Sequence, residues 1–126
     1  MTGDAGPLAQ ERVLIVEDRY LLASELAREV ERLGGSVVGP ARTLGQAAAL
    51  VDRESVHAVL LDINLDGEMA YPLAEALADQ DIPFIFLTGY GGEVLPPPWR
   101  NRPRLTKPID LRRLEFELVR LVRSKA

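Results

Sequence analysis

The segment "HAVLLDI", residues 57–63, is a short, continuous apolar run that includes an acidic residue near its end. The segment "RVLIVED", residues 12–18, has the same pattern. Runs of this kind are typical of strands that are buried on both faces of a parallel sheet. The two segments therefore predict central strands whose carboxyl ends carry carboxylates.

Further strands and helices alternate on both sides of these runs. Short apolar stretches at 36–40, 82–88 and 102–108 predict three more strands, and four segments with a helical apolar period accompany them. This alternation implies right-handed crossovers and a doubly wound α/β fold with a five-stranded parallel sheet. The residues predicted to face inward from the helices are Leu22, Leu26, Val30 and Leu33, then Leu44, Ala47, Ala48 and Val51, then Leu73, Ala76 and Leu77, and finally Leu111, Leu114, Leu118, Leu121 and Val122.

The composition excludes several kinds of site. The chain has 126 residues, 47% of them hydrophobic, and no apolar run approaches the length of a membrane span. It has no cysteine and a single histidine, His57, so thiolate sites and sites built from several imidazoles are excluded. With 15 basic and 19 acidic residues, it has no general attraction for nucleic acid or anionic lipid. We therefore expect a cytoplasmic protein whose partner is a protein or a small anion, and a local basic patch such as Arg112 with Arg113 is left open as an alternative.

The chain is long enough for one domain with one core. We expect residues 1–10 to form a mobile N-terminal arm and residues 11–126 to form the domain. No secretory signal is expected at the start, and no output domain is expected after the last helix.

Polar residues stand at four of the predicted strand ends. Glu17 and Asp18 follow the first strand, Asp62 the third, Thr88 the fourth and Lys107 the fifth. Ligands of an open doubly wound sheet bind beyond the carboxyl ends of its strands. Carboxylates without histidine or cysteine favour Mg²⁺, whereas lysine and threonine suit an oxyanion. The set predicts a Mg²⁺-dependent transfer of a phosphoryl group to Asp62.

Each of these residues also has a simpler explanation when it is taken alone. Asp18 could cap the first helix, and Asp62 could form an Asx turn after its strand. Thr88 and Gly89 could form an ordinary turn, and a Lys-Pro pair is common in loops. The combination of these residue types on separate strand ends is what favours a single reaction.

The segments "VED", "LLDIN", "LTG" and "TKP" resemble, in order and approximate spacing, the bacterial response-regulator receiver family. The resemblance covers nearly the whole chain and implies the flavodoxin-like strand order 2-1-3-4-5. It implies that Asp62 is phosphorylated by a sensor histidine kinase or a histidine phosphotransfer protein. The chain would then signal to a downstream protein target or act as a phosphate sink, and it would not be an enzyme. No contact with nucleic acid or membrane is implied.

The resemblance also assigns roles in the site. Asp18 would bind Mg²⁺ directly, Glu17 largely through water, and Asn64 through its backbone carbonyl. Thr88 would donate a hydrogen bond to the phosphoryl group, and Lys107 would pair with it. The Lys107–Pro108 bond would be cis.

The segment "LTGYGGEVLPPPWRNRPRLTKPI", residues 87–109, departs from the family in two ways. Its glycines and the prolines at 96–98 disfavour the usual helix, which is expected to be absent or shortened. Arg104 stands three residues before the lysine, where the family usually has Tyr or Phe. The overlapping segment "PFIFLTGYG", residues 83–91, resembles the stand-alone FATGUY subgroup, named for Phe-Ala-Thr-Gly-X-Tyr, with Leu87 in place of Ala and Tyr90 one position earlier. That resemblance implies a switch through Thr88, Gly89 and Tyr90, with Arg104 at the position of the missing aromatic. The simpler interpretation of Arg104 is a solvated strand residue.

The loop at 89–101 is expected to be mobile, with few ladder hydrogen bonds and little packing, and to reorder on phosphorylation. A simpler interpretation is that Tyr90 and Trp99 cover core left bare by the missing helix. Two other functions remain open. A phosphorylation-independent adaptor could keep the fold, although it needs no Mg²⁺ site. A hydrolase of the aspartyl-phosphate type would need a second aspartate where Asn64 stands.

Overall fold

The computed structural model describes residues 6–89 and 95–124, and its elements follow the predicted alternation. The main strands are β1 (Arg12–Val16), β2 (Ser36–Ala41), β3 (Ala58–Asp62), β6 (Phe84–Thr88) and β7 (Arg104–Thr106). The α-helices within the described residues are α1 (Tyr20–Arg32), α2 (Leu44–Arg53), α3 (Tyr71–Asp79) and α4 (Leu111–Arg123).

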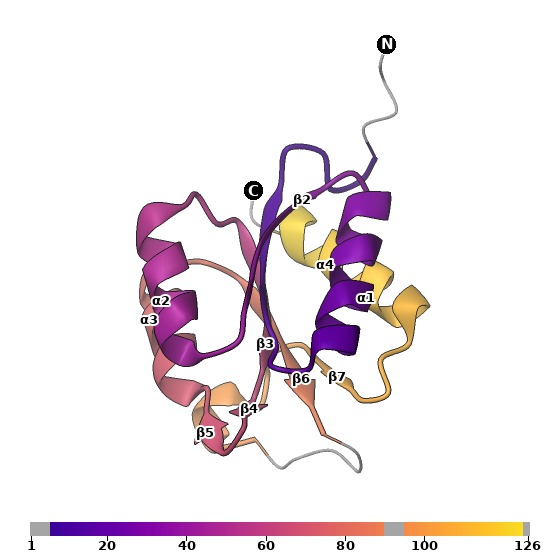
Figure 1. Cartoon of the computed structure of the whole chain (residues 1–126). Helices are drawn as coiled ribbons and strands as arrows, with labels where there is room; N and C mark the ends of the chain where they lie inside the picture. Colours follow the sequence, from indigo (N-terminus) through magenta and orange to yellow (C-terminus); the bar gives the residue numbers. More distant parts are fainter. Residues whose placement is uncertain (1–5, 90–94, 125–126) are drawn as a thin grey trace.

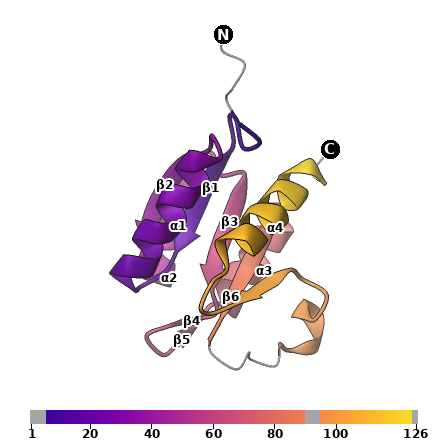
Figure 2. The same cartoon turned by 90° about the vertical axis from the view of Figure 1, so that its right-hand side faces the viewer.

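The main strands form a five-stranded parallel sheet in the order β2-β1-β3-β6-β7. Figure 1 shows this sheet between two helical layers, with α2 and α3 on one face and α1 and α4 on the other. In Figure 2, which is turned by 90°, α1 and α4 lie side by side in front of the sheet. The predicted fold class is confirmed, because β6 and β7 are the fourth and fifth strands of the predicted order.

The central strands are buried because helices cover both of their faces. All five residues of β3 and of β6 are buried, as are four of the five in β1. Leu60 of β3 pairs with Ile15 on one side and with Ile85 on the other. Burial on both faces explains why these strands are continuous apolar runs rather than alternating ones.

Side-chain caps define the starts of α2 and α4. Thr43 Oγ1 accepts a hydrogen bond from Gln46 N at 3.1 Å, and an Asp110 carboxylate oxygen accepts one from Arg112 N at 2.9 Å. These oxygens satisfy backbone N–H groups that have no partner inside the helix. In the described parts of the chain, none of the helices reaches the length and apolarity of a membrane span.

Three of the helical residues predicted to face inward do not do so. Ala48 and Ala76 are exposed. Ala47 is buried as predicted, and Ala74, which was not predicted to face inward, is also buried. Alanine is small and contributes little to the hydrophobic pattern of a helix, so the sequence does not show which alanines face the core. Leu111 is 39% exposed, since it lies in the first turn of α4, before that helix reaches the core.

The packed part of the chain begins before residue 11. Leu8, which the sequence places in the N-terminal arm, is completely buried. Its backbone N–H donates to the carbonyl of Leu33 at 2.9 Å, which ties the segment to the end of α1. Residues 6–10 are therefore docked on the domain, and the rest of the predicted arm, residues 1–5, lies outside the described residues.

A short hairpin follows β3 and is missing from the sequence prediction. Strands β4 (Asn64–Leu65) and β5 (Glu68–Met69) pair antiparallel. Asp66 and Gly67 connect them with positive φ values of 51° and 93°. Positive φ at both central residues is typical of the tight hairpin turn that Asp-Gly sequences favour. The hairpin places this turn beside the end of β3.

In the described part of the connection from β6 to β7, a tryptophan packs against the sheet. Within residues 95–103 the regular element is the 3₁₀ helix η1 (Pro97–Trp99). The Trp99 ring lies edge-on to Phe84 and to Phe86, at 6.0 Å from each. The prediction of an absent or shortened helix is confirmed for the described residues. The expectation of little packing is wrong for Leu95, which is 1% exposed, and for Trp99, which is 8% exposed.

Candidate functional site

Charged side chains from different strands meet at the carboxyl edge of the sheet. Lys107, which follows β7, donates from Nζ to Asp62 Oδ2 at 2.7 Å and lies 3.1 Å from Glu17 Oε1. Asp62 ends β3 and Glu17 directly follows β1. The side chain of Lys107 is 10% exposed, and those of Asp62 and Glu17 are 5% and 0% exposed. The sheet thus buries an ammonium group between two carboxylates.

The surroundings of Glu17 disfavour its ionised form. Burial raises its pKa to about 7, and the nearby Asp62 carboxylate acts in the same direction. A hydrogen bond from Arg19 N to Glu17 Oε2, 3.0 Å long, opposes this rise. The other oxygen, Oε1, is enclosed but makes no aligned hydrogen bond, although Lys107 is near. An enclosed oxygen without a hydrogen bond is the kind of atom that a bound cation satisfies.

Lys107 stays protonated in this environment. Burial alone lowers its pKa, but the hydrogen bond and charge of Asp62, together with the charge of Glu17, outweigh burial and raise the pKa overall. The Lys107 backbone is also fixed, because its N–H donates to the carbonyl of Thr88 at 2.9 Å. The Lys107–Pro108 bond is cis. The ammonium group is therefore held beside Asp62.

Asp62 is held at both of its oxygens. Oδ2 accepts from Lys107, and Oδ1 accepts from Asn64 N at 3.0 Å. The Asn64 side chain turns the other way and accepts from Gly67 N at 2.7 Å. These contacts orient the Asp62 carboxylate without closing it off, because Asp62 still lines an open cleft.

The donor set fits a hard divalent cation. Glu17, Asp18 and Asp62 each present a carboxylate oxygen, and these oxygens lie within 4.8 Å of one another. Oxygen ligands of this kind suit Mg²⁺, and the enclosed Oε1 atom of Glu17 belongs to the same cluster. Asp18 does not cap α1, whose N-cap is Arg19, so the simpler explanation of Asp18 is wrong.

The cleft above Asp62 has a volume of about 530 Å³. The sequence had predicted several of its lining residues, but it had missed Arg19, Asp66 and Gly67. The Asp-Gly turn signal could have indicated the last two. The lining residues are Asp18, Arg19, Asp62, Asn64, Asp66, Gly67, Gly89 and Lys107.

The predicted switch residues are only partly brought to this cleft. Thr88 is completely buried at the end of β6, and its Oγ1 donates to Thr106 Oγ1 at 3.2 Å. Gly89 lines the cleft. Tyr90 lies outside the described residues. Arg104 is an exposed residue of β7 that pairs with Phe86, as expected for a solvated strand residue.

Comparison with known proteins identifies the class. Residues 13–96 match the response regulator receiver domain, and the chain belongs to this family. It is 36% identical over 89 residues to the phyllosphere-induced regulator PhyR of Methylorubrum extorquens. The match covers 68% of this chain and 33% of PhyR, so the chain spans about a third of that relative.

Solved structures of similar proteins have the same fold. SdrG from Sphingomonas melonis Fr1 is 37% identical, with a TM-score of 0.80 over 97% of this chain and 99% of SdrG. The BeF3-activated conformation of SdrG from Pseudomonas melonis Fr1 is 38% identical, with a TM-score of 0.78 over 90% and 98%. PhyR from Brucella abortus is 34% identical, with a TM-score of 0.83 over 96% of this chain and 51% of PhyR.

Proposed function

We propose that this protein accepts a phosphoryl group on Asp62 from a sensor histidine kinase or a histidine phosphotransfer protein, in a Mg²⁺-dependent reaction. The observation that carries the proposal is the placement of Asp62. Its carboxylate is oriented by Lys107 and Asn64, lies beside Glu17 and Asp18, and still opens into a cleft. The contact with Asn64 N is the Asx turn that a structural aspartate would also make, but an Asx turn does not require Lys107 and two further carboxylates to lie beside Asp62.

In the proposed step, an oxygen of Asp62 forms a bond to phosphorus. The bond from phosphorus to the donor nitrogen or oxygen breaks, and the leaving group keeps that electron pair. Bound Mg²⁺ supplies positive charge that offsets the charge of the phosphoryl oxygens. Glu17, Asp18, Asp62 and the Asn64 carbonyl are the proposed ligands. Lys107 neutralises Asp62 before transfer and pairs with the phosphoryl group afterwards.

We further propose that the chain belongs to the FATGUY subgroup and that Thr88, Gly89 and Tyr90 form its switch. The sequence "PFIFLTGYG" and the short η1 connection support this proposal. Thr88 would exchange its hydrogen bond with Thr106 for one to the phosphoryl group, and the loop at 89–101 would reorder. One similar protein, SdrG, has a solved BeF3-activated conformation.

We propose the partners of the protein on the same grounds. The phosphodonor would be a kinase or phosphotransfer protein, and the output would be a protein contact or a phosphate sink. We propose residues 11–126, extended by the docked residues 6–10, as the receiver domain, and the cytoplasm as its location. An adaptor that works without phosphorylation is the alternative, but the buried charges at Asp62 argue against it.

The decisive experiment is the intact mass of the protein after incubation with acetyl phosphate and Mg²⁺. We expect one added phosphoryl group in the parent protein, and none in Asp62→Asn or in the presence of EDTA. Undiminished labelling of Asp62→Asn would place the phosphoacceptor elsewhere. An unlabelled parent protein would favour the adaptor, whereas sustained turnover of acetyl phosphate would favour a hydrolase.

A further inference from the structure

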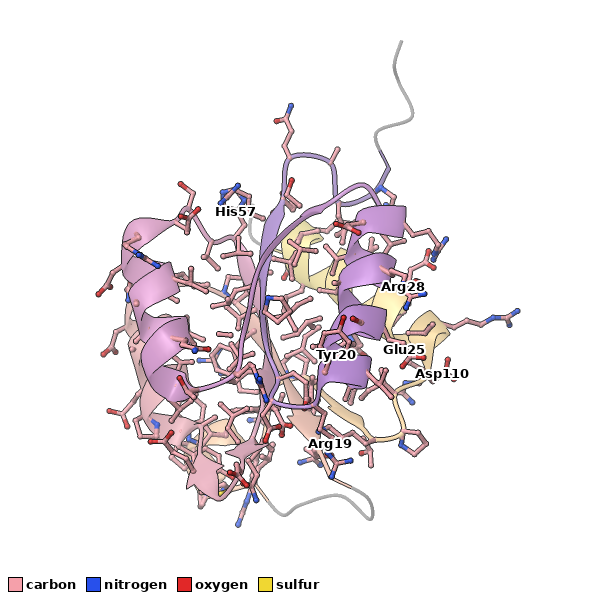
Figure 3. The ribbon with its side chains drawn as sticks, viewed as in Figure 1. Arg19, Tyr20, Glu25, Arg28, His57 and Asp110 are labelled. Atoms are coloured by element: carbon pink, nitrogen blue, oxygen red, sulfur yellow. The ribbon has the colours of Figure 1, made fainter. Side chains whose placement is uncertain are left out.

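A second cation, Arg19, lies at the mouth of the cleft. Arg19 and Lys107 are the basic residues among those that line it. Figure 3 shows Arg19 at the start of α1, at the same end of the molecule as the carboxyl ends of the strands. The two cations differ in exposure, because Arg19 is exposed whereas the Lys107 side chain is 10% exposed. Arg19 is thus the cation that an incoming molecule meets first.

The backbone of Arg19 is fixed relative to the acidic cluster. Its N–H donates to Glu17 Oε2 at 3.0 Å, and as the N-cap of α1 it has an extended conformation with φ −88° and ψ 116°. Its guanidinium group makes no hydrogen bond or ion pair with any described residue. The side chain is therefore anchored at its base, and its five N–H donors have no partner in the part of the chain that the structure describes.

The charged residues that line the cleft include three carboxylates, which would repel an anion. A phosphodonor is an anion, and Asp18, Asp62 and Asp66 line the cleft that it must enter. The charge of Lys107 is already shared between Asp62 and Glu17, at 2.7 and 3.1 Å. An approaching anion would otherwise meet a surface whose accessible charge is mostly negative.

We infer that Arg19 forms an anion subsite that holds the phosphoryl group of the donor before transfer to Asp62. The inference rests on the proposed function and names a residue that the reaction would otherwise not use. A guanidinium group can donate two parallel hydrogen bonds to phosphoryl oxygens, which an ammonium group cannot do. Arg19 thereby binds the donor, while Lys107 acts on the group being transferred.

The test uses acetyl phosphate as the probe, with the initial rate of phosphorylation measured by intact mass over a range of concentrations. In this reaction the bond from Asp62 oxygen to phosphorus forms, and acetate leaves with the electron pair of the broken bond. For Arg19→Ala we expect the half-saturating concentration to rise about tenfold, the scale of a lost charge-assisted hydrogen bond, with a nearly unchanged rate at saturation. Arg19→Lys should recover part of the loss. The matched control is Arg28→Ala, an exposed arginine on the same helix but away from the cleft.

A second measurement, the affinity for Mg²⁺, should increase in Arg19→Ala whereas the affinity for acetyl phosphate decreases. Removing the Arg19 charge beside three carboxylates should tighten Mg²⁺ binding about two- to threefold, the scale of a screened surface charge, as measured by calorimetry. A variant with a damaged site would lose affinity for both ligands. Equal kinetics in Arg19→Ala and Arg28→Ala, or weaker Mg²⁺ binding in Arg19→Ala, would overturn the inference. A parent protein that is not phosphorylated on Asp62 would instead overturn the proposed function, and the inference with it.

Discussion

The two ends of the sheet carry ion pairs of similar length in different surroundings. At the amino end, Arg12 contacts Glu54 at 2.6 Å, with side chains that are 38% and 41% exposed. At the carboxyl end, Lys107 contacts Asp62 at 2.7 Å, with side chains that are 10% and 5% exposed. Distance does not distinguish the pairs, but burial does. Water screens the first pair, whereas the second acts in a medium where each charge strongly affects its neighbours.

The largest effect that separates the two ends is expected from Lys107→Ala. Without its ammonium group, the rate of phosphorylation by acetyl phosphate should fall about a hundredfold or more, because a preorganised charge at the reacting group is lost. The matched variant at the amino end, Glu54→Ala, should keep the rate within about twofold of the parent. If both variants reacted at the parent rate, the buried pair would have no part in the chemistry.

The next largest effect is expected on metal affinity. Asp18→Asn removes one of three clustered carboxylates. Mg²⁺ binding should weaken by about tenfold or more, because losing even a group that only supports a ligand costs about ten- to a hundredfold in affinity. Isothermal titration calorimetry measures this change. Asp52→Asn, which removes an exposed carboxylate on α2, serves as the control. Unchanged affinity in Asp18→Asn would remove this residue from the proposed ligand set.

A smaller effect is expected in the pH dependence of stability. The pKa of Glu17 rises from 4.5 to about 7 on folding, so the folded chain binds more protons than the unfolded chain between these values. The contribution of Glu17 to stability is therefore largest below pH 4.5 and is lost as the pH rises through about 7. The Glu17→Gln variant has no titrating carboxyl group at this position, so its stability should lack this dependence on pH.

Urea unfolding with EDTA at several pH values measures the difference. The Gln variant should have a higher denaturation midpoint than the parent at pH 8, and the difference should vanish toward pH 4. Parallel pH profiles of the two proteins would show that burial does not raise the pKa of Glu17.

The smallest effect is expected at the amino end. A double-mutant cycle on Arg12 and Glu54 should give a coupling of about 0.2–1 kcal/mol, the usual range for exposed ion pairs. The coupling should shrink in high salt. A larger value would contradict the contrast between the two ends.

The sequence predicted the central sheet because its strands are continuous apolar runs, and it predicted the site because parallel strands end at one edge. Parallel strands place Asp62 and Lys107 at the same edge of the sheet. Their direct ion pair was not predicted, because the family resemblance implied that Lys107 pairs with the phosphoryl group.

The parts that escaped prediction depend on packing rather than on pattern. Leu8 is a single apolar residue without a period, and its burial follows from a contact with the end of α1. The β4–β5 strands have two residues each, which is too short for an alternating pattern. Arg19 itself has an extended backbone at the N-cap of α1, and the sequence does not reveal this conformation or the position that it gives the side chain.

The chain contains a single tryptophan, and Trp99 stands where β6 and β7 are joined. Trp99 is 8% exposed, and its ring packs edge-on to Phe84 and Phe86 and lies 5.7 Å from the Arg102 guanidinium group. All indole emission from the unlabelled protein therefore comes from one site with a cationic neighbour. A movement of that ring into water would shift the emission to longer wavelength. The fluorescence of Trp99 therefore reports on the conformation of the connection between β6 and β7.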